Sequence, residues 1–88
     1  MDLHELRGKI DEIDDDLIRL FNKRMDVASE IAAYKKLHNL PVHDPDRERQ
    51  KLADASGKVD GTRTAHIAAL FSLLFELSRA EQENKNTA

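Results

Sequence analysis

The chain has 88 residues, of which 40% are hydrophobic and 35% are charged, and its formal net charge is −3. It contains no cysteine, which excludes disulfides and thiolate metal sites. The negative charge argues against nucleic acid or an acidic membrane as a partner. No apolar run reaches the length of a membrane span and the basic start of a signal peptide is lacking, so we expect a soluble cytoplasmic protein.

The first predicted element is one very long helix, from Leu3 to Leu37. Scarce glycine, proline and aromatic residues favour helices over strands throughout the chain. Within this segment the apolar residues recur in steps of three and four, the spacing of one helix face. The stripe consists of Leu3, Leu6, Ile10, Ile13, Leu17, Leu20, Val27, Ile31 and Tyr34.

Two further helices are predicted after the long one. Asp44-Pro45 has the residue types of a helix N-cap and first helical position, and it opens a short helix that runs through about Ala55. The composition of residues 56–61 is that of a loop. A third helix is expected to begin near residues 62–64 and to fade into a polar tail from Glu81 onward.

The length of the first helix bears on assembly. A helix of about 35 residues is roughly 52 Å long, whereas a compact chain of this size has a radius of gyration of about 12 Å. The apolar stripe has a period close to 3.5, which allows two helices to wrap around each other. We therefore expect an all-α fold with three helices per chain, in an intertwined homodimer whose long helices pair antiparallel. We also expect residues 1–88 to form one domain, with a polar tail over about 83–88.

Arg24 and Lys35 break the apolar stripe of the long helix. Arg24 occupies a position where the next apolar residue is expected, and Lys35 lies eleven residues later, only about 20° further round the helix. Burying an unpaired charge is costly, so these cations either have carboxylate partners or await an anionic ligand. The alternative to a ligand is that Arg24 forms an ion pair with Asp14, with Glu48 or with a carboxylate of a second chain.

Arg7 is a third candidate, although it is far from Arg24 within one chain. Seventeen residues of helix separate the two by about 25 Å, so a small ligand cannot touch both. An antiparallel partner can bring its own Arg7 beside Arg24. The alternative is a solvated arginine or a surface ion pair with Asp11 or Asp14.

Three other polar residues qualify as candidates. Arg47 lies at the third position of the short helix, where the helix dipole disfavours a cation, although a surface ion pair would also explain it. Ser78 and Gln82 lie four residues apart on one side of the third helix, and the alternative for them is a solvated last turn. Together with the cations they would line a small pocket for an anion.

Neither a metal nor a cofactor is expected. The four histidines show no paired ligand spacing: His4, His38, His43 and His66. No histidine lies on an inward stripe, and no close pair of carboxylates lies beside a nucleophile. This inventory suits a dicarboxylate ligand that reacts without covalent or general-base chemistry.

Several fragments of the chain, taken in order and at their spacing, point to one family: 6–11 with Ile13-Asp14, Arg24, Tyr34-Lys35, 40–48 and 76–82. Through them the chain resembles the all-helical class of chorismate mutase over nearly its whole length. The opening and the Leu77-Ser78 stretch look most like the mutase domain of bifunctional chorismate mutase–prephenate dehydratase proteins, which implies fusion to a dehydratase domain.

The resemblance implies an isomerase that converts chorismate to prephenate in phenylalanine and tyrosine biosynthesis, without a cofactor and at sites shared between two chains. By this match, Arg24 and Arg7 of the partner chain hold the two substrate carboxylates. Ser78 and Arg47 assist them.

The same match assigns the rest of the site. Glu48 and the backbone of Asp44 contact the ring hydroxyl. Lys35 and Gln82 donate hydrogen bonds to the ether oxygen, which gains negative charge as the carbon–oxygen bond breaks.

Other readings stay open. The same fold could serve an isochorismate-pyruvate lyase, whose middle segment departs from the pattern over 44–48, or a mutase of 4-amino-4-deoxychorismate. A non-catalytic dimerisation module would use Arg24 and Lys35 to set helix register.

Overall fold

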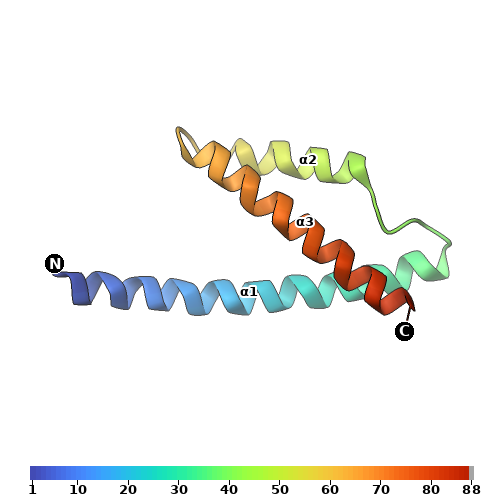
Figure 1. Ribbon diagram of the computed structural model, residues 1–88, viewed down its shortest axis with the longest axis horizontal. Coiled ribbons are helices and arrows are strands. Elements are labelled where there is room, and N and C mark those ends of the chain that lie inside the picture. The colour runs from blue at the N-terminus through green and yellow to red at the C-terminus, as the bar shows by residue number, and fades with distance from the viewer. Residues whose placement is uncertain (88) are drawn as a thin grey trace.

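The computed structural model describes the backbone of residues 1–87 and the side chains of residues 1–84, and it shows an all-helical fold (Figure 1). Helix α1 spans Leu3–Leu37, as predicted. The carboxylate of Asp2 caps its N-terminus by accepting a 2.8 Å hydrogen bond from the backbone N–H of Glu5. His38 is the C-cap of the helix and is followed by Asn39, which has a left-handed φ of 55°.

Helices α2 and α3 begin and end within a residue or two of the predicted bounds, except at the end of α3. Helix α2 spans Pro45–Ser56, and Asp44 caps it by accepting a 3.1 Å hydrogen bond from the backbone N–H of Arg47. Helix α3 spans Arg63–Thr87. The turn before it contains Gly61 with a φ of +61°, a conformation that glycine adopts without steric cost.

The helices are arranged with α3 between the other two. Helix α3 packs against both α1 and α2, while α1 and α2 make no close backbone approach to each other within the described residues. Figure 1 shows α3 running beside α2 from the interhelical turn and then crossing the C-terminal half of α1. This crossing brings all three helices together around one region, close to the residues of α1 that interrupt its apolar stripe.

The single chain buries little and leaves half of α1 uncovered. The buried apolar side chains are Ala28, Ala32, Ala55 and Phe75. Every residue from 1 to 23 is exposed, including the apolar stripe, so Leu6 and Ile13 retain 47% and 54% of their accessible surface. The radius of gyration is 16.1 Å and the longest extent is 54 Å, so the chain is elongated, as the length of the first helix indicated.

The expectation that the third helix fades at Glu81 is wrong, because α3 continues through Thr87. Two contacts explain the extra turns. Ser29 of α1 donates a 2.9 Å hydrogen bond to the carboxylate of Glu81, and Gln82 is only 7% exposed. Packing against α1 therefore stabilises a segment whose composition alone indicated fraying. Ala88 and the side chains beyond residue 84 lie outside the described residues.

Candidate active site

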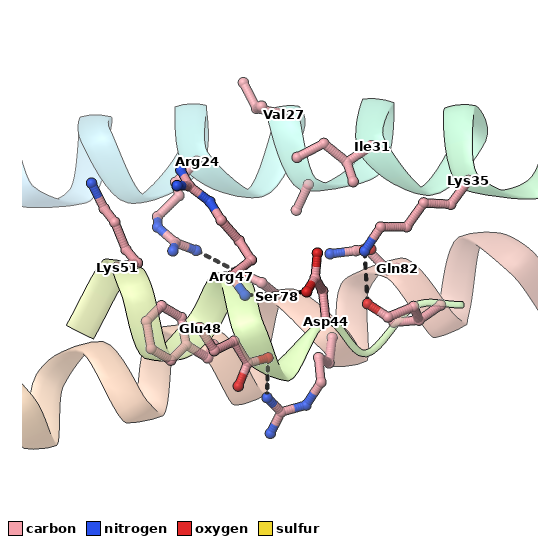
Figure 2. Close-up of a pocket in the computed structure, with 14 residues that line it drawn as sticks. Arg24, Val27, Ile31, Lys35, Asp44, Arg47, Glu48, Lys51, Ser78 and Gln82 are labelled. Atoms are coloured by element: carbon pink, nitrogen blue, oxygen red, sulfur yellow. Dashed lines mark hydrogen bonds and ion pairs between the residues drawn. The ribbon is translucent and has the colours of Figure 1, made fainter. Parts of the chain in front are cut away.

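A cavity of about 410 Å³ lies where the three helices meet. Its volume falls in the usual range for small-molecule sites. Figure 2 shows α1 on one side of the cavity and α2 with α3 on the other. It is lined by every predicted site residue except Arg7: Arg24, Lys35, Asp44, Arg47, Glu48, Ser78 and Gln82. Residues that are distant in the sequence therefore share one cavity.

Arg24 extends from α1 toward α3. Its Nη1 donates a hydrogen bond to the hydroxyl of Ser78 (Figure 2). Burial lowers the pKa of Arg24, because desolvation disfavours the charged guanidinium. No carboxylate of the described residues forms an ion pair with it, so neither Asp14 nor Glu48 is its partner. The cation is held in place by a neutral hydroxyl and retains capacity for an anion.

Lys35 and Gln82 reach the other end of the cavity from α1 and α3 (Figure 2). The Nζ of Lys35 donates a 2.7 Å hydrogen bond to the backbone carbonyl of Val42. This contact ties the loop after α1 to the site. The Oε1 of Gln82 is buried and has no hydrogen-bond partner among the described residues, an arrangement that costs free energy in the absence of a ligand.

Asp44 and Arg47 line the cavity at the start of α2. The Asp44 carboxylate serves as the helix cap described above. The guanidinium of Arg47 is 3.4 Å from the amide oxygen of Gln50, a neutral partner rather than the carboxylate that a surface ion pair would supply. Figure 2 shows Arg47 extending from α2 toward Arg24 on α1, so two guanidinium groups approach the same part of the cavity.

Glu48 is paired within the protein. The Nη1 of Arg79 lies 2.5 Å from its Oε2, and the Nε2 of His43 lies 3.8 Å from its Oε1. The side chains of Arg79 and Glu48 are 30% and 24% exposed, so this ion pair is partly shielded from water.

The sequence analysis did not identify Arg79 and Lys51 as site residues, although both line the cavity. Lys51 lies four residues after Arg47 on the same helix, and this spacing places both on one face, which was a usable signal. Arg79 follows Ser78 directly and lies about 100° further round α3, so periodicity alone gave no signal for it. The apolar walls of the cavity come from Val27, Ala28, Ile31, Val42 and Phe75.

The cavity is cationic in an acidic chain. Five cationic side chains and two carboxylates line it, giving the lining a formal charge of +3, whereas the whole chain carries −3. Since Glu48 is ion-paired, the remaining cations are available to a ligand. A concave site with this excess of positive charge suits a small anion that carries more than one negative charge.

Arg7 lies apart from this cavity. It is exposed on the N-terminal half of α1, and it makes no hydrogen bond or ion pair in the part of the chain that the structure describes. The alternative of an ion pair with Asp11 or Asp14 is therefore not observed. No group of three potential ligands among the described residues could hold a metal ion. None of the described helices has both the length and the apolar character needed to cross a membrane.

Fold and cavity together define a small helical domain built around a cationic site for a small organic anion. The chain belongs to the chorismate mutase type II family, whose model matches residues 6–83.

Three relatives illustrate this membership. The bifunctional chorismate mutase/prephenate dehydratase of Escherichia coli K12 is 36% identical over 80 residues, which covers 89% of this chain and 21% of that protein. The bifunctional protein of Aquifex aeolicus is 47% identical over 49 residues, covering 56% of this chain and 14% of that protein. A chorismate mutase of Methanocaldococcus jannaschii is 40% identical over 47 residues, covering 53% of this chain and 48% of that protein. The chain thus spans less than a quarter of the length of these bifunctional relatives.

Proposed function

We propose that this domain is a chorismate mutase, an isomerase that converts chorismate to prephenate in aromatic amino acid biosynthesis. The observation that carries the proposal is the single cavity in which cations from all three helices meet Ser78 and Gln82. Family membership supports the reaction type. In this rearrangement a carbon–carbon bond forms while the ether carbon–oxygen bond breaks, and no atom enters or leaves.

Binding rests on the arginines. Chorismate carries two carboxylates, and a guanidinium binds a carboxylate through two parallel hydrogen bonds. Arg24, assisted by Ser78 and Arg47, holds one carboxylate, and Arg7 of the partner chain completes the clamp. Fixing both carboxylates folds the substrate so that the two reacting carbons approach each other. Part of the rate acceleration arises because conformational freedom is lost on binding and not in the reaction step.

Electrostatic stabilisation supplies the rest. Lys35 and Gln82 donate hydrogen bonds to the ether oxygen, where negative charge grows in the transition state. One such preorganised donor is typically worth about 3–4 kcal/mol. Glu48 and the backbone of Asp44 orient the ring through its hydroxyl group. Support for this assignment comes from the arrangement of Lys35 and Gln82 at one end of the cavity and Glu48 in its wall.

The functional unit that we propose is a homodimer. The exposed apolar stripe of α1 needs a cover, and Arg7 is too far along the helix to serve the cavity of its own chain. A second copy whose long helix runs antiparallel covers the apolar stripe and brings its own Arg7 to the cavity. Fusion to a prephenate dehydratase domain and a cytoplasmic location stay predictions, the former suggested by the bifunctional relatives.

The direct test is incubation of the chain with chorismate while its ultraviolet absorbance is followed, with identification of the product. Prephenate is expected. Formation of salicylate and pyruvate from isochorismate, or turnover of 4-amino-4-deoxychorismate in preference to chorismate, would assign the site to a related reaction. No turnover of any of the three by the dimer would favour a non-catalytic dimerisation module.

A further inference from the structure

Arg79 forms the shielded ion pair of the cavity. Its Nη1 lies 2.5 Å from Glu48 Oε2, with 30% and 24% of the two side chains exposed. The chain offers a contrasting pair on the outer face of α2, where Arg49 contacts Asp46 and the side chains are 70% and 87% exposed. Coulomb attraction is screened less at the shielded pair, so Arg79 constrains its carboxylate more strongly than Arg49 does.

The position of Glu48 creates a difficulty for an anionic ligand. Its carboxylate lines a cavity suited to a dianion, and an uncompensated negative charge there would repel the ligand. Arg79 offsets that charge. It also fixes one carboxylate oxygen, Oε2, while within the described side chains Oε1 has only the more distant His43, at 3.8 Å. A carboxylate held in this way keeps an oxygen available to accept a hydrogen bond from a hydroxyl group.

We propose that Arg79 is a positioning residue for Glu48: it neutralises and orients this carboxylate so that Glu48 can accept the ring hydroxyl of a dianionic substrate without repelling it. The proposal rests on the function proposed above. Arg79 acts through Glu48 and makes no contribution of its own to the carboxylate clamp. The two residues come from different helices, so the ion pair links α2 to α3 beside the cavity.

The test is a double-mutant cycle on chorismate turnover with Arg79→Met, Glu48→Gln and the double variant. Arg79→Met should raise KM by about tenfold with a smaller change in kcat, because the hydroxyl contact is similar in the ground and transition states. In the Glu48→Gln background the same change should alter KM by less than about twofold, since a neutral amide neither repels the substrate nor needs a cation.

Two further variants separate positioning from folding. Arg79→Lys keeps the charge and should stay within about threefold of wild type. Arg49→Met removes the exposed ion pair with Asp46 and should leave KM within about twofold of wild type. Thermal unfolding of all variants identifies losses that arise from the fold.

Each outcome bears on the proposal. Equal losses from Arg79→Met with Glu48 present and with Gln at position 48 would overturn it, because Arg79 would then contact the ligand itself or act on the fold. If the wild-type protein turns over chorismate but the effects of Arg79→Met and Glu48→Gln on KM are additive, this inference is overturned and the proposed function stands. A wild-type dimer without turnover would overturn the proposed function, and this inference with it.

Discussion

Arg24 of α1 donates a hydrogen bond to the hydroxyl of Ser78 of α3, 54 residues later in the chain, and no carboxylate of the described residues neutralises it. Burial lowers the pKa of Arg24, because desolvation disfavours its charged form. The guanidinium loses solvation on folding, and this loss lowers its pKa. The resulting cost in folding free energy is fully present at every pH below the pKa in the folded state. Desolvation of Arg24 therefore opposes folding, while its hydrogen bond to Ser78 favours folding.

The first prediction concerns the opposite effects of Arg24 on activity and on stability. Arg24→Met should lower kcat and raise KM for chorismate together, because the carboxylate contact serves both binding and orientation. Its unfolding temperature should be no lower than that of wild type, since an uncompensated, partly buried charge is removed and a long apolar side chain remains. Steady-state kinetics and thermal unfolding of the same preparations check both parts.

The neighbouring Lys23, which is exposed, provides the control. Lys23→Met should leave kinetics and unfolding temperature close to those of wild type. An Arg24→Met protein that unfolds well below wild type would show that the hydrogen bond to Ser78 outweighs the cost of desolvation.

The second prediction separates transition-state stabilisation from binding. Lys35→Ala should reduce kcat by about 10²–10³-fold with a smaller effect on KM, because the ether oxygen gains charge mainly as the bond breaks. Lys36→Ala is the matched control, as the adjacent residue is exposed and does not line the cavity. A Lys35→Ala effect confined to KM would remove Lys35 from the reacting oxygen. Lys35 also donates to the carbonyl of Val42, so unfolding temperatures are measured alongside.

The third prediction tests whether the site is shared between two chains. Arg7→Ala and Arg24→Ala proteins should each be inactive. When they are unfolded and refolded together in equal amounts, about a quarter of the wild-type activity should return, because half of the random dimers are hybrids and one of the two sites in each hybrid carries both arginines. Sedimentation equilibrium should show a dimer at the concentrations used in the assay. An active monomer, or mixed proteins that stay inactive although hybrids form, would contradict the shared site.

Features of the fold that depend on local sequence were predicted correctly, whereas features that depend on contacts between helices were not. The bounds of α1 and the start of α2 are set by local features, namely the apolar spacing and the Asp44-Pro45 cap, and both were correct. The end of α3 was wrong because its last turns depend on contacts with α1, such as that of Ser29 with Glu81, which no local pattern contains. The same limit applies to Arg79, since its pairing with Glu48 exists only once α2 and α3 are packed.

The last prediction concerns Gln82, which is 7% exposed and whose Oε1 has no hydrogen-bond partner among the described residues. Its neutral amide donates without titrating, so Gln82→Glu can donate to the ether oxygen only while its carboxyl group is protonated. The ionised form would place a negative charge beside the one that develops in the reaction. The variant should therefore be weak near neutral pH and recover as the pH falls through the pKa of the new glutamate. Burial among apolar neighbours and an anionic substrate both raise that pKa, while Lys35 opposes the rise.

The pH profiles of kcat/KM and kcat decide the role of Gln82, because the first reports the pKa in the free protein and the second the pKa in the substrate complex. Wild type should show no matching gain at low pH, and Gln82→Met, which can neither donate nor titrate, should be weak at every pH at which the protein stays folded. The recovery of Gln82→Glu then isolates the proton as the feature that matters, because size and burial are nearly the same in the protonated acid and the amide. A Gln82→Glu protein with full kcat/KM at neutral pH and a profile parallel to wild type would place Gln82 away from the reacting oxygen, and the donor role of this part of α3 would be wrong.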